Sequence, residues 1–266
     1  MTNEELQQRI ALLESENASL RETLRLREGL IRSTFGRYLT DEVLEDILQH
    51  QDAPPTTGEL RTVTMMFSDL RSSTALSEQM NARDFIRMLN HFYAEMIEII
   101  NAWRGNILEF VGDEIVAVFG APRPNDDAAA EAVACAVAMQ RRMGAVNEWN
   151  RSEGYPEIAM GIGIHTGEAV LGTIGSETRS KYDMIGRNVN LASRIQGFTS
   201  GGQIYISGET LAAAGEAVRI NPAGERWVQP KGIEESILLH EVAGYGRSAV
   251  PGFENLPKSV EEGEKL

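Results

Sequence analysis

The sequence predicts an α+β fold in which a ferredoxin-like layered domain follows a parallel coiled-coil helix. Three observations predict this class: a heptad repeat in the first 32 residues, strand pairs that alternate with long helices from residue 59, and a hydrophobic content of 42%. That content is typical of a globular chain with a core. Hairpins that alternate with crossover helices favour an α+β layer over a doubly wound parallel sheet.

Residues 1–32 are predicted to form a coiled-coil dimerisation helix. One seam, with Asn17 and Arg27 as its polar members, alternates at spacings of four and three through Leu6, Ile10, Leu13, Leu20, Leu24 and Ile31. Asn17 at heptad position a favours a parallel two-stranded coil, in which a buried Asn fixes the register at a cost in stability. The alternative is a single amphipathic helix lying on the domain, but such a helix usually shows a broader apolar face.

Residues 33–58 are predicted to be a helical transducer or linker. A second helical pattern follows a predicted N-cap at Thr40, and the sequence APPTTG at 53–58 breaks it. The main domain is expected at residues 59–243. Residues 244–266 are predicted to be a loose acidic tail, because Gly, Pro, Glu and Lys dominate them.

The main domain is predicted to begin with a strand, a helix and a hairpin. The strand at 62–67 is rich in β-branched and apolar residues. The helix at 81–103 starts with a capping-box pattern of Asn81 and Asp84 and continues with apolar residues at helical spacing. A hairpin follows at 106–119, with its turn in the sequence VGD.

The second half of the domain alternates in the same way. An alanine-rich helix is predicted at 126–143, followed by a hairpin at 157–174 with Gly167 in its turn. A short strand at 181–185 precedes a helix at 188–198. The last predicted strands cover residues 203–207, 225–228 and 236–241.

Charge and cysteine content exclude several classes of function. With 25 Lys and Arg against 39 Asp and Glu, the net charge is −14, which argues against a nucleic-acid partner and against docking on anionic membranes. The single cysteine, Cys135, excludes an intramolecular disulfide and a four-cysteine zinc site. The sequence shows no secretory leader and no apolar stretch of about 18 residues, so we expect a cytoplasmic chain without direct membrane insertion.

Two carboxylates stand at positions suited to metal binding. Asp69 ends a predicted strand and precedes small polar residues that open a helix, whose backbone N–H groups can hold phosphate. Asp113 lies at the tip of the hairpin, and it converges with Asp69 if the hairpin neighbours the first strand. Paired carboxylates beside a phosphate cradle suit a site for two Mg²⁺ ions. Taken singly, each Asp is better explained as a turn cap.

Three further polar residues stand where they could meet a phosphorylated ligand. Asn190 and Arg194 are four residues apart on a predicted helix, so they share one face and could orient a sugar and stabilise developing charge. Lys231 lies in a tight turn between two strands. Taken alone, each is better explained as a solvent-exposed side chain.

Taken together, these segments resemble the class III nucleotidyl cyclases, the catalytic domains of adenylyl and guanylyl cyclases. The resemblance covers residues 61–241 and rests on four motifs in the expected order, FSDLRSST, FVGDEIVAVFG, GIGIHTGEAVLGTIGS and KYDMIGRNVNLASRI. The sequence FGRYL at 35–39 is similar to the segment that couples upstream helices to such domains.

The resemblance implies a metal-dependent reaction on a purine nucleoside triphosphate. Asp69 and Asp113 would bind two Mg²⁺ or Mn²⁺ ions per active site, with the backbone carbonyl of Leu70 as a further ligand. The ribose 3′-hydroxyl would attack the α-phosphorus in line and release pyrophosphate. Asn190 would orient the ribose, Arg194 would stabilise the transition state, and the remaining phosphates would be held by Lys231 and Thr74.

The resemblance also implies a homodimer with two composite active sites. In this family the metal-binding aspartates come from one subunit and the contacts to base, ribose and phosphate from the other. A parallel coiled coil that leads into two identical domains fits this arrangement.

The two base-selecting positions give opposite indications. Glu109 indicates GTP, because a carboxylate accepts from guanine N1–H and the N2 amino group, whereas adenine N1 would repel it. Asp183 indicates ATP, since related adenylyl cyclases use an Asp there to accept from adenine N6. We favour GTP because Asp183 can protonate, turn away or act through water, and relaxed specificity is the alternative.

A rival hypothesis from another class is a degenerate, dimeric regulatory module without turnover. The presence of the metal, ribose and phosphate residues argues against it, and a coiled-coil adaptor would not explain them. His165 could act as a general base, but its place in a glycine-rich strand end favours a structural role.

Overall fold

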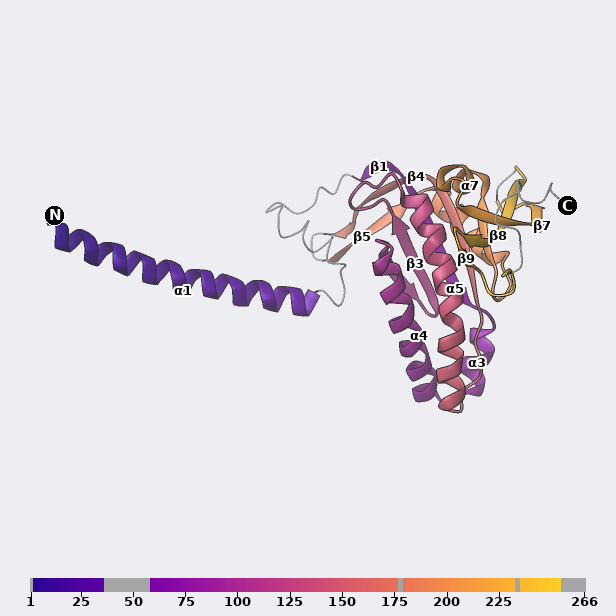
Figure 1. Ribbon diagram of the computed structural model, residues 1–266, viewed down its shortest axis with the longest axis horizontal. Helices are drawn as coiled ribbons and strands as arrows, with labels where there is room; N and C mark the ends of the chain where they lie inside the picture. Colours follow the sequence, from indigo (N-terminus) through magenta and orange to yellow (C-terminus); the bar gives the residue numbers. More distant parts are fainter. Residues whose placement is uncertain (1, 36–57, 177–178, 233–234, 255–266) are drawn as a thin grey trace. The chain divides into compact units, whose positions relative to one another are not determined.

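The computed structural model describes residues 2–35, 58–176, 179–232 and 235–254, and the chain divides into two compact units, Met1–Pro54 and Pro55–Leu266 (Figure 1). Residues 36–57 of the predicted linker, with its cap Thr40, lie outside the described residues. The same holds for residues 255–266 of the predicted tail.

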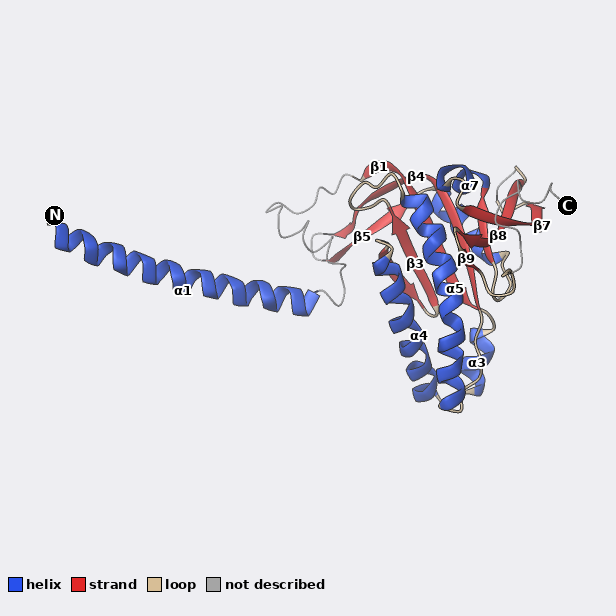
Figure 2. Ribbon diagram, in the orientation of Figure 1, coloured by secondary structure: helices blue, strands red, loops and turns tan. Residues whose placement is uncertain are grey.

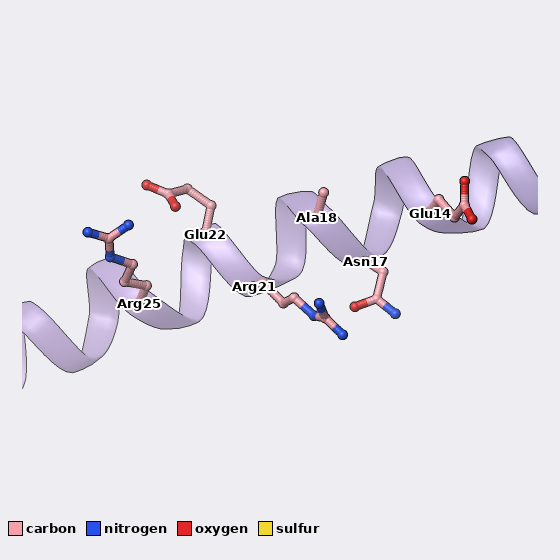
Figure 3. Close-up of a pocket in the computed structure, with 6 residues that line it drawn as sticks. All are labelled: Glu14, Asn17, Ala18, Arg21, Glu22 and Arg25. Atoms are coloured by element: carbon pink, nitrogen blue, oxygen red, sulfur yellow. The ribbon is translucent and has the colours of Figure 1, made fainter.

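The first unit contains helix α1, Asn3–Phe35, over the predicted coiled-coil segment. The large apolar side chains between Leu6 and Leu30 are 41% to 67% exposed. A shallow pocket is lined by α1 alone, and Figure 3 shows the side chains that line it, Glu14, Asn17, Ala18, Arg21, Glu22 and Arg25. Because no other element supplies a wall, we assign no ligand site to it. The helix is present as predicted, and its pairing in a parallel coiled coil stays a prediction.

In the described part of the second unit, nine strands form one sheet in the order β2-β3-β1-β4-β6-β8-β7, with β5 paired to β4 and β9 to β8. The strands are β1 Glu59–Leu70, β2 Asn106–Val111, β3 Glu114–Phe119, β4 Met160–Ser176, β5 Arg179–Ile185, β6 Ile204–Ser207, β7 Val218–Val228, β8 Ile237–Tyr245 and β9 Ser248–Ala249. The helices are α3 Ser73–Gln79, α4 Ala82–Ala102, α5 Ala128–Ser152, α6 Arg187–Gly197 and α7 Gly208–Ala214.

The first four strands and their helices form the predicted ferredoxin-like arrangement. Along the chain β1 is followed by α3 and α4, the β2–β3 hairpin, α5 and β4. In space the order is β2-β3-β1-β4 with antiparallel neighbours. This split β-α-β-β-α-β topology confirms the predicted α+β class.

Hydrophobic residues cover both faces of the sheet, because successive β1 side chains point to opposite sides. Met66 belongs to a cluster formed with α4 and α5, whereas Met65 and Phe67 pack in a second cluster with β5 and α6. Figure 2 shows α4 and α5 side by side along one face of the sheet. The strand ends that carry the candidate residues are therefore anchored from two sides.

The prediction of a hairpin at 157–174 is wrong, because β4 runs unbroken through Gly167. It pairs with β1 from Leu70↔Met160 to Glu59↔Leu171. The glycines make room for α6 instead of forming a turn: a Cβ on Gly163 would lie 2.2 Å from the backbone nitrogen of Gln196. Close packing between helix and strand explains the glycine pattern that the sequence alone presented as a turn.

Other differences concern ends and small elements. Helix α5 extends to Ser152, nine residues beyond its predicted end, and α7 and β9 were not predicted. The sheet continues to Ala249 and Val250 is buried, so the loose tail does not begin at 244. Asn81 caps α4 through the N–H of Arg83, but Asp84 accepts from Tyr155 and does not complete a capping box. No helix in the described ranges is both long enough and apolar enough to span a membrane.

Candidate active site

The structure brings Asp69 and Asp113 together at one end of the sheet. Strands β1 and β3 are paired through Ser68↔Ile115, so the end of β1 lies beside the turn that precedes β3. The N–H of Leu70 donates to Oδ2 of Asp113 over 3.1 Å. Gly112 has φ +64° in the two-residue turn between β2 and β3, a left-handed conformation that glycine adopts without steric cost.

Asp69, Asp113 and Glu114 form an acid cluster. Burial and the neighbouring Asp113 raise the pKa of Asp69 to about 7, and Arg71, whose Nη2 lies 2.9 Å from Oδ2 of Asp69, opposes this shift. Burial followed by Asp113 also raises the pKa of Glu114. The protein thus concentrates negative charge at the end of β1 and only partly compensates it.

The carboxylate oxygens at this site suit divalent cations that prefer oxygen ligands, such as Mg²⁺. No group of three or more His, Cys, Asp and Glu side chains is gathered for a metal among the described residues. The predicted pair offers two carboxylates, Asp69 and Asp113. Mg²⁺ is commonly held by one or two carboxylates with substrate phosphates and water completing its shell. Burial and then Asp113 raise the pKa of Asp69, and a bound cation would relieve the repulsion between the two carboxylates.

Tyr93 of α4 holds the turn that carries Asp113. Its hydroxyl group donates to the carbonyl oxygen of Gly112. Burial, with the charges of Asp113 and Asp69, raises the pKa of Tyr93 to about 12, so it stays a donor. The tyrosine therefore ties the hairpin to the helix layer next to the acid cluster.

The two predicted base-selecting residues lie together around Lys181. The Nζ atom of Lys181 is 2.9 Å from Oε2 of Glu109 and 3.0 Å from Oδ2 of Asp183. The hydrogen bond to Glu109, followed by the one to Asp183, raises the pKa of Lys181. The other oxygen of Asp183 accepts from the N–H of Met184 over 2.8 Å. Both oxygens of Asp183 therefore have partners within the chain.

Helix α6 carries Asn190 and Arg194. Two of its buried residues anchor it, Ala192 in the cluster that includes β1, β4 and β5, and Ile195 in a cluster with β6, β7 and β8. Asn190 is exposed and Arg194 is half-buried. A Cβ added at Gly232 would lie 3.6 Å from Nη2 of Arg194. The guanidinium group thus lies beside the turn that carries the exposed Lys231.

Thr74 is exposed in the first turn of α3, shortly after the end of β1. Within the described ranges, no hydrogen bond or ion pair joins the acid cluster to the Glu109–Lys181–Asp183 group or to Arg194. The division of the predicted site between two protomers stays a prediction. The metal, ribose and phosphate roles assigned to these residues stay predictions.

His165 lies in β4 and is buried, with partners in β6 and α6. Its Nδ1 lies 2.8 Å from the hydroxyl oxygen of Ser207, and its Nε2 lies 3.3 Å from Oδ1 of Asn188. Burial lowers the pKa of His165. A ring that is 3% exposed and engaged at both nitrogens supports the structural interpretation over a general base.

Sequence reasoning missed Arg71, Tyr93 and Lys181. Arg71 and Lys181 each stand two residues from an assigned aspartate, a spacing that in a strand puts side chains on the same face. That spacing could have identified Lys181. Tyr93 gives no comparable local signal, because its contact with Gly112 joins a helix to a distant turn.

Comparison with known proteins agrees with this architecture. The sequence profile of the adenylate and guanylate cyclase catalytic domain matches residues 56–241. Adenylate cyclase 1 of Rhizobium meliloti is 31% identical over 217 residues, which are 81% of this chain and 32% of that protein. An uncharacterized protein of Mycobacterium tuberculosis is 32% identical over 222 residues, 81% of this chain and 39% of that protein. The chain thus spans about a third of the length of these relatives.

Two solved structures extend the similarity to the fold. The crystal structure of the guanylyl cyclase Cya2 has 44% identity and a TM-score of 0.70, over 77% of this chain and 100% of that one. The adenylyl cyclase CyaB from P. aeruginosa has 31% identity and a TM-score of 0.68, over 71% of this chain and 97% of that one. A profile match over most of the chain and similar folds lead to one conclusion: the chain belongs to the family of class III adenylate and guanylate cyclase catalytic domains.

Proposed function

We propose that the protein is a nucleotidyl cyclase that converts a purine nucleoside triphosphate into the 3′,5′-cyclic monophosphate and pyrophosphate. The observation that carries the proposal is the convergence of Asp69 and Asp113 at the end of β1, with the N–H of Leu70 bound to Asp113. Family membership supplies the reaction class. The presence of all five metal, ribose and phosphate residues argues against a degenerate regulatory module; they are Asp69, Asp113, Asn190, Arg194 and Lys231.

Each of the assigned site residues has a role in this reaction. Arg194 stabilises negative charge that develops on the α-phosphoryl group, and Lys231 beside it binds the outer phosphates. Asn190 orients the ribose so that its 3′-hydroxyl lies in line with the α-phosphorus. Two Mg²⁺ or Mn²⁺ ions held by Asp69, Asp113 and the Leu70 carbonyl would supply neutralisation of the triphosphate and a lower pKa of the 3′-hydroxyl.

A homodimer would complete the site. One protomer presents the acid cluster and the other presents Glu109, Asp183, Asn190 and Arg194. The exposed apolar seam of α1 supports association through a parallel coiled coil. A head-to-tail pair of identical domains contains two such composite sites.

GTP is the favoured substrate. Glu109 can accept from both donors on the Watson–Crick edge of guanine. Lys181 offsets the charge of Asp183, which would otherwise repel guanine O6. The solved guanylyl cyclase at 44% identity supports the same preference. ATP is the alternative because Asp183 can accept from the adenine amino group.

The test is product identification with purified protein, Mn²⁺ or Mg²⁺, and each of the four nucleoside triphosphates. We expect cyclic GMP and pyrophosphate as the main products and no product from an Asp69→Asn variant of unchanged stability. No cyclic nucleotide under any condition would overturn the enzyme assignment. Cyclic AMP alone would overturn only the preference for GTP.

A further inference from the structure

Arg71 lies within the acid cluster and is held on two sides. Its Nη2 is 2.9 Å from Oδ2 of Asp69 and 3.3 Å from the carbonyl oxygen of Asp69. Its Nη1 is 3.4 Å from the carbonyl oxygen of Thr199, just after α6. The side chains of Arg71 and Asp69 are 25% and 30% exposed. Partial burial makes this ion pair stronger than one on the open surface.

The guanidinium group occupies an Asp69 oxygen to which a divalent cation could bind. Mg²⁺ binds carboxylate oxygen at about 2.1 Å, so an ion on Oδ2 of Asp69 would face the Arg71 charge at close range. Arginine keeps its proton in proteins and therefore cannot give way by becoming neutral. The cation can bind Asp69 fully only when Arg71 moves away.

We propose that Arg71 competes with the divalent cation for Asp69 and weakens metal binding in the absence of nucleotide. The inference rests on the assignment of Asp69 and Asp113 as metal ligands in the proposed function. It makes metal binding depend on the triphosphate, because phosphate oxygens offer the displaced guanidinium group new acceptors.

Two features of the side chain favour its release. The Nε–H of Arg71 is buried and has no partner in the described part of the chain, so the contact with Asp69 leaves one donor unsatisfied. The bond to Thr199 uses the other end of the guanidinium group and does not depend on Asp69. Arg71 can therefore leave Asp69 while one of its anchors is kept.

The test is a titration of the full chain with Mn²⁺ alone, in which electron paramagnetic resonance measures the free ion. We expect Arg71→Met to lower the Kd for Mn²⁺ by about tenfold, by analogy with the proton, whose affinity for a carboxylate changes at least tenfold when a neighbouring arginine is removed. The Kd of Arg71→Lys for Mn²⁺ should lie between that of Arg71→Met and that of the wild type. The matched control is Arg87→Met, since Arg87 pairs with Glu153 instead, at 2.8 Å, and should leave the Kd unchanged.

Asp69→Asn separates the two ways in which the inference can fail. If Asp69→Asn leaves Mn²⁺ affinity unchanged, the ligand assignment and the metal-dependent function built on it are wrong. If Asp69→Asn weakens binding but a stably folded Arg71→Met does not tighten it, only the competition is refuted. Absence of Mn²⁺ binding to both wild type and Arg71→Met also refutes it, whereas binding to Arg71→Met alone supports it.

Discussion

Lys181 connects the two carboxylates that are proposed to read the purine. Replacing it by methionine leaves Glu109 and Asp183 without their shared cation, so Asp183 repels guanine O6 more strongly. We expect the ratio of kcat/KM for GTP to that for ATP to fall by about three- to tenfold, a modest effect because ion pairs exposed to water are weak. Steady-state rates with both nucleotides would measure the ratio.

Arg151 provides the matched control for Lys181. It is an exposed cation that pairs with Glu157 at 3.0 Å, and its replacement by methionine removes the same charge elsewhere on the domain. The ratio of the two specificity constants should stay at the wild-type value in Arg151→Met. An equal change in both variants would indicate a general charge effect and contradict the role of Lys181.

The site was predicted from short-range sequence patterns. The residues that were missed, Arg71, Tyr93 and Lys181, act through contacts that such patterns do not show. Asp69 and Asp113 are recognisable because each ends or joins strands in a sequence with clear turn signals. The partners that shape their charge come from other elements, as Tyr93 does from α4. Burial and cross-strand register decide such contacts, and neither is readable from local spacing.

His165 should make stability depend on pH near neutrality. Burial lowers the pKa of His165 below its ordinary value of 6.5, so the unfolded chain binds this proton more readily than the folded chain. The free energy of unfolding therefore falls as the pH drops through about 6.5 towards the lower folded pKa. Urea unfolding across this range should show a shallower pH dependence for His165→Gln than for the wild type. Parallel curves for the two proteins would contradict the prediction.

Helix α6 packs closely on β4 because glycines of β4 face it, and the contact leaves no room for a methyl group. In Gly163→Ala the added Cβ would meet the backbone nitrogen of Gln196 at 2.2 Å, so the helix must shift. We expect a loss of about 1–3 kcal/mol in the free energy of unfolding. Cyclase activity should fall by about a hundredfold, because Asn190 and Arg194 move with the helix. Chemical denaturation and initial rates measure the two effects.

Gly144 offers the control for this substitution within α5. A Cβ there meets nothing within 4 Å, and alanine favours a helix over glycine by about 0.5–1 kcal/mol. Gly144→Ala should therefore raise the free energy of unfolding and leave activity unchanged. Equal losses of stability in the two variants would refute the packing explanation for Gly163.

At the level of elements, prediction succeeded where periodicity is strong and failed where tertiary packing gives a residue its role. The amphipathic helix α4 and the β2–β3 hairpin match the predicted segments closely. Gly167 was expected to mark a turn, but it lies in β4 where a Cβ would meet the Asn188 side chain. A single sequence cannot tell a glycine that turns the chain from one that admits a helix.

The whole chain carries a net charge of −14 and is proposed to bind a polyanionic triphosphate. Bulk charge opposes this binding, so the few cations near the site must act locally. Arg194 and the Lys231 turn lie together, but no ion pair among the described residues joins them to the acid cluster. The proposed active site shared between two protomers would bring both sets to one nucleotide, and it would make assembly a condition for activity.

Mixing inactive variants tests this shared site. Asp69→Ala removes a residue of the metal half and Arg194→Ala one of the other half, so each homodimer should be inactive. A heterodimer of the two contains one intact composite site and one doubly defective site. Random pairing at equal amounts makes half of the dimers mixed, so activity should return to about a quarter of the wild-type value.

The control mixture of Asp69→Ala with Asp113→Ala should stay inactive, since both substitutions affect the same half and every composite site retains a defect. Rates are compared after subunit exchange, with heterodimers verified by two affinity tags. Verified Asp69→Ala/Arg194→Ala heterodimers without activity would contradict the shared site, because such dimers then contain no complete set of residues. Activity in the control mixture would contradict the assignment of both aspartates to one half.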